Sequence, residues 1–304
     1  MTTLSPQCPD CAGESFRIGP IPATDTFAGR RLNRPFLNGA LYRCRHCSLG
    51  FKWPRPTKDE LDALYRQGDE FAWSSSVQSR CDWHIARTWL EATLAPGARI
   101  LDVGCFDGSF LEPLVGRYSC NGIEIHPEAS KRAEQKGIQV IGKDFSSLRG
   151  AFDCISAIDV IEHVERPRNF ISDCLAALTP GGYLLLSTGN LDAVAFRIMG
   201  SRYWYCAIGE HISFLSKDWF AKHGTALGYQ ILRQTTFAHG DASWSRRLRE
   251  IAINLFYRSC RPAFRALRRL GLGGKNARSC PELADHPPRW LSARDHVMVL
   301  LAKA

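Results

Sequence analysis

Two features that would direct a protein into or across a membrane are missing from this sequence. No run reaches the roughly 18 apolar residues that are needed to cross a bilayer. The first residues, MTTLSPQCPDC, show neither the basic nor the apolar stretch of a secretory signal. We therefore expect a cytoplasmic protein. Because disulfides are rare in that compartment, most of the twelve cysteines are expected to be small buried apolar residues.

A third glycine is missing from the turn that follows the first strong strand pattern. In ILDVGCFDGSF the apolar run ends at Asp102, and the turn holds Gly104 and Gly108, with Phe106 where such turns usually keep a glycine. A dinucleotide places its pyrophosphate on the helix N-terminus, and Asp107 would oppose a phosphate there. S-adenosylmethionine (SAM) has no phosphate and carries positive charge, so the turn favours SAM over a dinucleotide.

Acidic residues after the next two strand patterns support the same choice. Glu124 ends the second pattern, in NGIEIH, where a carboxylate can accept hydrogen bonds from both ribose hydroxyls. Asp144 follows the third, in GKDF, and suits the adenine amino group, with Phe145 beside the ring. A dinucleotide site would share only the ribose acid. Together with the turn, these acids predict a SAM site.

An amine-holding tetrapeptide is also missing. The sequence after the fourth strand pattern is DVIE, starting at Asp159, and does not resemble the Asn-Pro-Pro-Tyr stretch with which amino-methylating enzymes hold a planar amine. An oxygen, or with less support a carbon, is therefore the expected methyl acceptor.

The first four cysteines form two Cys-x-x-Cys pairs, separated by 32 residues. Each pair can present two thiolates at the tip of a tight turn, and two such tips make a closed tetrahedral zinc site. Four thiolates leave no open coordination position, so the expected Zn²⁺ is structural. The alternative is two chance pairs of buried thiols. The predicted ligands are Cys8, Cys11, Cys44 and Cys47.

From residue 99 onward, strand and helix patterns alternate, which predicts an α/β fold. The expected helices include one over 108–116 and one over 217–227 that starts at a Ser216 cap. We expect a Rossmann-like doubly wound sheet of seven strands whose last strand is antiparallel, preceded by a small zinc ribbon. The expected division is a ribbon over 1–56, a helical linker over 57–98, a SAM-binding domain over 99–238 and 295–304, and an insertion over 239–294.

Several motifs then resemble one family. LDVGCFDGSFL, GIEIHPEA, FDCISAIDVIEHVERP and LTPGGYLLLSTGN are similar, in order and spacing, to the motifs of class I SAM-dependent methyltransferases. CPDC and YRCRHCSLGFKWPRPTKDELDALY resemble the zinc-ribbon start of bacterial methyltransferases of sugar, polysaccharide and secondary-metabolite pathways. The resemblance covers about 99–238 with the closing strand, and 1–66.

The resemblance implies roles for single residues. Asp102, Gly104 and Gly108 would shape the methionine pocket, and Asp159 would sit beside the sulfonium. Glu124 would bind the ribose, and Asp144 with Phe145 the adenine. Cys105 and Ile125, in the same motifs, complete the predicted cofactor site. Phe106 departs from the pattern, and we expect its side chain to point off the loop.

Two histidines are candidates for the base that a hydroxyl acceptor needs. His163 lies in IEHVE and is expected to be mainly structural, closing the pocket wall or capping a turn. His211 follows the fifth strand, where the substrate loop should lie; it is either the base or a hydrogen-bonded loop histidine. The remaining predicted substrate residues are Asn190, Tyr203, Trp204 and Tyr205. The aromatic triplet could stack on an acceptor ring or simply pack a lid.

The net charge of +9 is concentrated near the end of the chain. Residues 239–294 hold 12 basic and 4 acidic residues. Within them, residues 244–270 read as one or two cationic amphipathic helices. Their apolar face either packs on the protein itself or contacts an anionic membrane, which would place the protein peripherally at the inner membrane face. Nucleic acid is disfavoured as a partner.

The predicted function is SAM-dependent methylation, on an oxygen of a small molecule: a sugar, a lipid-linked glycan or a secondary metabolite. An RNA or protein methyltransferase, docking through the ribbon and the arginines, is one alternative. It lacks support from clustered aromatic and basic residues in the core. A catalytically silent SAM-binding or scaffold protein is the other.

Overall fold

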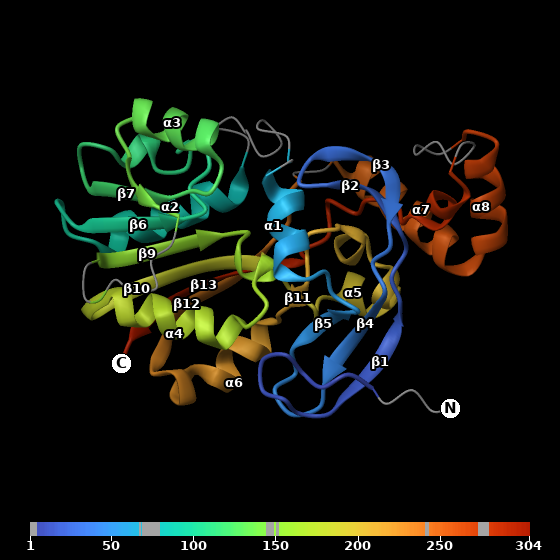
Figure 1. The fold of residues 1–304 in the computed structure, drawn as a ribbon, viewed down its shortest axis with the longest axis horizontal. Helices are drawn as coiled ribbons and strands as arrows, with labels where there is room; N and C mark the ends of the chain where they lie inside the picture. Colours follow the sequence, from blue (N-terminus) through green and yellow to red (C-terminus); the bar gives the residue numbers. More distant parts are fainter. Residues whose placement is uncertain are drawn as a thin grey trace. The chain divides into compact units, whose positions relative to one another are not determined.

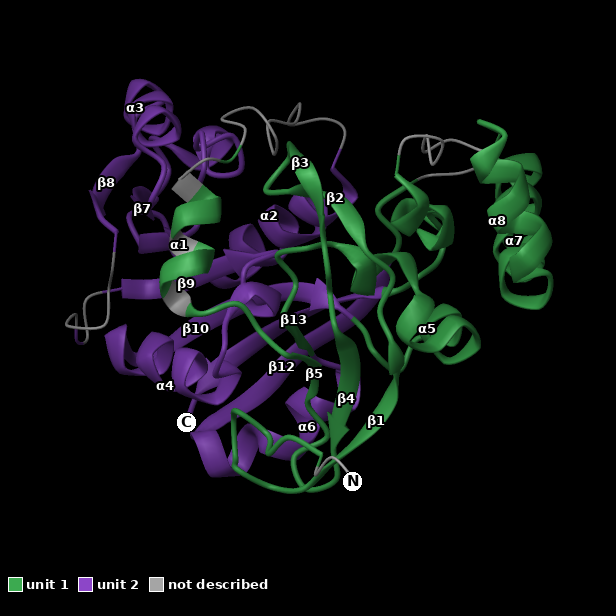
Figure 2. Cartoon of the chain, turned by 45° about the vertical axis from the view of Figure 1, so that its right-hand side comes forward, with its two compact units in different colours: residues 1–72, 190–214, 238–295 green, residues 73–189, 215–237, 296–304 purple. Residues whose placement is uncertain are grey.

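The computed structural model describes residues 5–66, 68, 80–143, 149, 152–240, 243–272 and 280–304. They form two compact units, coloured separately in Figure 2. Unit 1 comprises residues 1–72, 190–214 and 238–295, and unit 2 comprises 73–189, 215–237 and 296–304. Among the described helices, none combines the length and the apolarity that crossing a bilayer would require.

Unit 2 is built on a sheet of seven strands in the order β12-β13-β10-β9-β6-β7-β8. Only β13 runs antiparallel to its neighbours β10 and β12. The predicted fold class is therefore confirmed. The strands are β6 (Arg99–Val103), β7 (Ser119–Ile123), β8 (Gln139–Gly142), β9 (Phe152–Ile158), β10 (Leu178–Gly189), β12 (Tyr229–Phe237) and β13 (His296–Lys303).

Helices cover both faces of this sheet (Figure 1). On one face α2 (Cys81–Thr93) and α3 (Pro127–Gln135) contribute to an apolar core with the strands, through Trp83, Leu90 and Ala133. On the other face lie α4 (Pro167–Ala177) and α6 (Lys217–Leu227). Helix α6 begins where expected, because the Ser216 hydroxyl accepts the backbone N–H of Trp219 as an N-cap.

The helix expected over 108–116 is not an α-helix. These residues form turns and a short 3₁₀ helix, η1 (Glu112–Leu114). Gly108 at φ +76° and Gly116 at φ +88° bound the segment in left-handed conformations. Pro113 between them has no N–H to donate. Helix propagation is therefore blocked within the segment.

Unit 1 contains a sheet of four strands in the order β1-β4-β5-β11 and the hairpin β2-β3. Residues 190–214 belong to this unit because β11 pairs with β5, although the strand pattern grouped them with the SAM-binding domain. Its strands are β1 (Ser15–Pro20), β2 (Thr24–Phe27), β3 (Arg30–Phe36), β4 (Ala40–Cys44), β5 (Gly50–Trp53) and β11 (Ser213–Phe214).

The helices of unit 1 come from all three of its segments. Helix α1 (Lys58–Arg66) starts at a capping box, in which Glu60 accepts the backbone N–H of Thr57 at 2.7 Å. The others are α5 (Val194–Met199), α7 (Trp244–Ser259), α8 (Arg261–Arg269) and the 3₁₀ helices η3 (Gly200–Arg202), η4 (Trp204–Ala207) and η5 (Pro281–Asp285). Within 244–270, the part of the chain in which one or two helices are expected, α7 and α8 are thus both helical.

Candidate functional site

The carboxyl ends of β6 and β9 carry the first polar pair of the candidate site in unit 2. Asp102 on β6 is buried, and its Oδ1 accepts the hydroxyl of Ser156 on β9 at 2.7 Å. From β6 the next strands are added toward one edge of the sheet, and from β9 toward the other edge. Open α/β sheets bind their ligands at such a switch point. Burial raises the pKa of Asp102 to about 7, and the Glu124 carboxylate adds to this. A cation bound beside Asp102 would hold it ionised.

Glu124 follows β7 and orients two neighbouring loops. Its Oε2 accepts the backbone N–H of Phe106 at 2.9 Å, and its Oε1 accepts that of His126 at 2.7 Å. Burial raises the pKa of Glu124, and the backbone donors oppose that shift. A carboxylate has about four acceptor sites. Capacity therefore remains for two ligand hydroxyls.

The turn after β6 depends on its glycines. Gly104 lies at φ +74° and Gly108 at φ +76°, in the left-handed region that favours glycine. A Cβ on Gly108 would come within 2.3 Å of the Ile138 side chain, so this glycine lets the turn pack against the residue before β8. Cys105 between them is buried, and that burial raises the pKa of its thiol. Cys105 is therefore a packing residue of the turn.

Phe106 also adopts a left-handed conformation, at φ +47°. Few residues with a side chain do so without steric cost. The Arg132 guanidinium of α3 lies over its ring, with 5.7 Å between the charged carbon and the ring centre. This separation is within the cation–π limit of about 6 Å. The ring thus points toward α3, which agrees with the expectation that it leaves the loop.

Asp159, expected beside the sulfonium, is paired with a residue that the sequence did not single out. It follows β9 at φ +55°, and its Oδ1 accepts the Ser187 hydroxyl at 3.2 Å. Its Oδ2 lies 2.5 Å from an Nη of Arg80, which precedes α2 and also pairs with the buried Asp82. One guanidinium of unit 2 is thus shared by two carboxylates, those of Asp82 and Asp159. Arg80 lies outside the methyltransferase motifs quoted above, so the sequence held no signal for it.

The adenine side of the candidate site is only partly described. Ile125, directly after Glu124, is 55% exposed, although it follows a buried strand. An exposed apolar side chain there suits the face of a planar ring. Asp144 and Phe145 lie outside the described residues.

His163 lies in the 3₁₀ helix η2 (Ile161–His163) of unit 2 and is half-buried. Its neighbour Glu162, which the sequence did not single out, is 1% exposed and accepts the Thr188 hydroxyl of β10 at 2.9 Å. This bond ties η2 to the end of β10. His163 thus lies on a short helix held to the carboxyl edge of the sheet.

The two Cys-x-x-Cys pairs come together in unit 1. Cys8 Sγ lies 3.6 Å from Cys47 Sγ, and Cys11 Sγ lies 3.5 Å from Cys44 Sγ. All four sulfurs lie within 4.8 Å of one another. These separations exceed a disulfide bond of about 2.05 Å and approach the ~3.8 Å edge of a tetrahedron with Zn–S bonds of about 2.3 Å.

The backbone around the four thiols has the form of two matching turns. The residue after each pair, Ala12 at φ +56° and Ser48 at φ +67°, is left-handed. The backbone N–H of Cys47 points at Cys44 Sγ, at 3.3 Å. A Cβ on Gly13 would lie 3.2 Å from Cys11 Sγ. The four sulfurs therefore occupy a tight cradle whose donor set fits Zn²⁺.

His211 lies in unit 1, in the loop before β11, and is buried. Its Nδ1 is 3.2 Å from the Tyr205 carbonyl, and the two rings are 4.2 Å apart. Because a carbonyl oxygen only accepts, Nδ1 is the donor of this contact, and in the neutral ring Nε2 then bears the lone pair. This tautomer gives Nε2 the capacity to act as a base.

The other predicted substrate residues of unit 1 are mostly buried. Tyr203 is fully buried and donates its hydroxyl to Asp295, while Tyr205 is 3% exposed within the same apolar cluster. Trp204 packs partly buried against this cluster, and Asn190 is buried. Burial of the tyrosines favours the packing interpretation of the triplet over an open stacking platform.

A buried lysine supports the His211 loop, and no sequence signal indicated it. The Lys52 Nζ on β5 donates to the carbonyls of Ile208 and Gly209 and to Asn38 Oδ1, the last at 2.8 Å. Burial lowers the pKa of Lys52 to about 7. Through the Ile208 and Gly209 carbonyls, Lys52 holds the backbone that leads into His211.

A family model described as "Methyltransferase domain" matches residues 75–234, which is more than half of the chain. Strands β6 to β10 of unit 2 and most of β12 lie within this match, whereas β13 lies beyond its end. The Cys cluster and the cationic insertion lie outside it.

Curated relatives align with part of the chain. "Ubiquinone biosynthesis O-methyltransferase" from Xanthomonas axonopodis pv. citri is 34% identical over 130 residues, covering 38% of this chain and 54% of the relative. The protein of the same description from Burkholderia thailandensis is 26% identical over 133 residues, covering 39% and 57%. The chain thus spans about half the length of these relatives.

Solved structures share the fold. The crystal structure of the [4+2]-cyclase SpnF has a TM-score of 0.50 and 17% identity, covering 82% of this chain and 97% of that one. At this identity the likeness concerns the fold alone.

Proposed function

The chain belongs to the methyltransferase-domain family, and on this premise we propose that it transfers a methyl group from SAM to a small-molecule acceptor. The observation that carries the proposal is the arrangement at the carboxyl edge of unit 2. Buried Asp102 and Glu124 flank a turn whose glycines Gly104 and Gly108 are left-handed. A zwitterionic, phosphate-free nucleoside suits this acid-lined edge, where a pyrophosphate would meet carboxylates.

The residues of unit 2 would divide the work of binding SAM. Glu124 would accept the ribose hydroxyls while it continues to hold the Phe106 and His126 backbone. Asp102 would face the cationic methionine moiety, and Ile125 would cover one side of the adenine. Asp144 and Phe145 remain proposed partners of the adenine on the basis of their motif. When bound, SAM supplies an electrophilic methyl carbon on a sulfonium.

For the acceptor we propose a hydroxyl of a sugar, lipid-linked glycan or secondary metabolite. The curated relatives are described as O-methyltransferases, which supports oxygen as the acceptor atom. In the proposed step the acceptor oxygen forms a bond to the methyl carbon and the carbon–sulfur bond breaks, leaving S-adenosylhomocysteine. The hydroxyl proton must go to a base.

We assign that proton to Nε2 of His211, whose Nδ1–H is directed at the Tyr205 carbonyl. This hydrogen bond fixes the tautomer and the ring orientation, and Lys52 fixes the backbone that precedes it. His163 is proposed as a structural residue at the edge of unit 2.

Replacing His211 with alanine is expected to lower turnover about 100-fold or more, with SAM affinity unchanged. His211→Asn is expected to be equally slow, because its amide can donate to the Tyr205 carbonyl without supplying a base. Radiolabelled methyl transfer and calorimetry measure the two quantities. The matched control is His84→Ala, an exposed histidine of α2. Turnover near the wild-type rate in His211→Asn would exclude the base role.

Replacing Phe106 with glycine is expected to leave SAM affinity within about threefold of the wild-type value, because φ +47° suits glycine. The ring that is lost lies under Arg132, on the α3 side of the loop. Calorimetric titration of the variant measures the affinity. A large loss would mean that the ring forms part of the cofactor pocket wall.

We propose that Cys8, Cys11, Cys44 and Cys47 bind a structural Zn²⁺. Support comes from the four sulfurs within 4.8 Å of one another and the matching turns that present them. Such a site is closed to substrate, since all four positions are taken by the protein.

The experiment for the function is methyl transfer from radiolabelled SAM to glycan and lipid extracts, followed by the mass of the product. A methylated glycan or lipid supports the proposal. Transfer to RNA or protein instead would identify an RNA or protein methyltransferase, which would dock its substrate through the ribbon and the arginines. SAM binding without transfer to any of these acceptors would favour a catalytically silent protein.

A further inference from the structure

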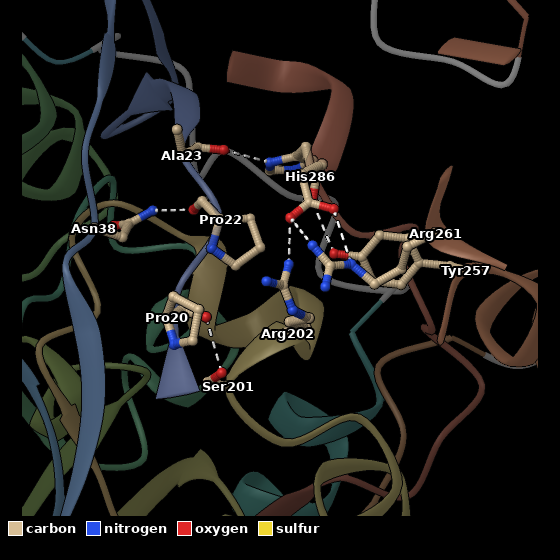
Figure 3. Close-up of polar contacts among 10 residues, drawn as sticks. Pro20, Pro22, Ala23, Asn38, Ser201, Arg202, Tyr257, Arg261 and His286 are labelled. Atoms are coloured by element: carbon tan, nitrogen blue, oxygen red, sulfur yellow. Dashed lines mark hydrogen bonds and ion pairs between the residues drawn. The ribbon is translucent and has the colours of Figure 1, made fainter. Parts of the chain in front are cut away.

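Polar contacts fasten helices α7 and α8 of the insertion to other parts of unit 1 (Figure 3). Arg261 of α8 donates to Asp285 Oδ2 at 2.9 Å, and Arg202 of η3 pairs with the same carboxylate. The Tyr257 hydroxyl of α7 donates to the Asp285 carbonyl at 2.7 Å. Beside it, the His286 ring contacts the Ala23 carbonyl at 3.1 Å. These contacts define which face of α7 is turned inward.

The inward face of α7 is further fixed by its own residues. Tyr257 is fully buried and Asn254 is buried, with Asn254 Nδ2 directed at the Arg289 carbonyl. Glu250 accepts both the backbone N–H and the hydroxyl of Ser292, at 2.8 and 2.6 Å. Glu250, Asn254 and Tyr257 are spaced by four and three residues, so they form one face of the helix.

A second face of α7 is apolar and exposed. Its residues are again spaced by four, three and four, which places them in one stripe. Their exposed fractions are 78% for Trp244, 62% for Leu248, 38% for Ile251 and 42% for Leu255. Because the inward face already packs on unit 1, this stripe is not the face that holds α7 in place. At the end of α8 and directly after it, three further leucines are exposed: Leu267 by 40%, Leu270 by 62% and Leu272 by 57%.

The charge around this apolar stripe has one sign. Residues 244–270 contain eight arginines and one acidic residue, Glu250, which belongs to the inward face. At 100° per residue, Arg247 and Arg258 lie on the flank of the stripe, and both are exposed. The Arg247 guanidinium lies 5.8 Å from the centre of the Trp244 ring. The exposed surface of α7 thus combines an apolar stripe with arginines along one flank of that stripe.

We infer that this stripe docks the protein on the surface of an anionic lipid bilayer. Leucine and isoleucine side chains would enter the boundary of the acyl chains, and arginines beside them would pair with lipid phosphates. A tryptophan at one end suits the interfacial region, where its ring is apolar and its N–H remains wet. A second copy of the chain would bring arginines against arginines, and a nucleic acid would leave the leucines exposed to water.

Flotation of the full-length protein with vesicles tests this inference without reference to catalysis. Binding is expected to vesicles of phosphatidylcholine with about 30% phosphatidylglycerol, and to be weak on phosphatidylcholine alone. Leu248→Ser with Leu255→Ser should lower the partition coefficient about tenfold or more, because two apolar side chains leave the bilayer. The matched control changes two leucines that are as exposed elsewhere, Leu37→Ser with Leu232→Ser, and should bind as the wild type does.

Three results would overturn the inference. One is the absence of binding to anionic vesicles at physiological salt. Another is undiminished binding of the Leu248→Ser, Leu255→Ser variant, which would assign binding to arginines alone. The third is a wild-type dimer in sedimentation that becomes monomeric in that variant, which would assign the stripe to a second copy. Loss of methyl transfer with intact flotation would contradict the proposed function and leave the docking surface standing.

Discussion

Replacing Cys44 with serine is expected to abolish zinc binding and to lower the free energy of unfolding by about 4 kcal/mol or more. Cys44 ends β4, its carbonyl accepts the backbone N–H of Ser48, and its sulfur accepts the backbone N–H of Cys47. Without the ion, three thiols would remain crowded within 4.8 Å. The turns of unit 1 would then lose the group that holds them together.

Metal content and thermal unfolding measure this effect. We expect about one zinc ion per wild-type chain, little in Cys44→Ser, and a lower melting temperature in the variant or after chelation. Cys81→Ser is the matched control, because Cys81 is an exposed cysteine outside the cluster. A wild-type protein that purifies without zinc and melts like Cys44→Ser would refute the structural zinc.

Replacing Glu124 with alanine is expected to weaken SAM binding about 100-fold or more, because two hydrogen bonds to a charged acceptor would be lost. The same change removes the acceptor for the backbone N–H groups of Phe106 and His126. The loops on both sides of the site would therefore lose their common support. The free energy of unfolding should fall as well, by about 1–3 kcal/mol.

Two further variants separate ligand contact from loop support. Glu124→Gln retains the size and one acceptor oxygen, so it should melt closer to the wild type while still binding SAM weakly. Glu128→Ala, on the exposed side of α3, removes only an exposed ion pair with Lys131 and should bind normally. Wild-type affinity in Glu124→Ala would exclude a ribose-binding role for this residue.

The succession of strands along the chain in unit 2 was predictable because each signal is local. Asp102 and Glu124 end apolar runs that are long enough for single strands, and glycine or proline turns separate these runs from helical patterns. The antiparallel pairing of β13 follows from two apolar strands, 229–237 and the closing one, joined by a long insertion. The helix expected over 108–116 was wrong because its apolar spacing was counted without the cost of Pro113 and two left-handed glycines.

The partners of the site residues were not predictable in the same way. Arg80 reaches Asp159 across 79 residues of sequence, and Lys52 reaches the Ile208 carbonyl across 156. Pairs of residues so far apart in the chain produce no periodicity or motif in the sequence. The four cysteines were predictable despite similar separation, because thiol pairs at Cys-x-x-Cys spacing have few other uses in a chain without disulfides.

In the amphipathic insertion, the helices were predictable from the sequence but the burial of their faces was not. Its helical periodicity predicts an apolar face but not whether the protein itself covers that face. Tyr257 and Phe264 prove to be buried, whereas Trp244 and Leu248 are exposed. Only the contacts of Glu250 and Asp285 distinguish the inward face from the outer one.

Calorimetric titration of the purified chain with SAM, and separately with NAD⁺, tests the central claim most directly. The account predicts saturable binding of about one SAM per chain, with S-adenosylhomocysteine competing for it, and no binding of NAD⁺, whose pyrophosphate would meet Asp107 and the buried acids. Binding of NAD⁺ in place of SAM, or no heat with either ligand from a folded protein, would contradict it.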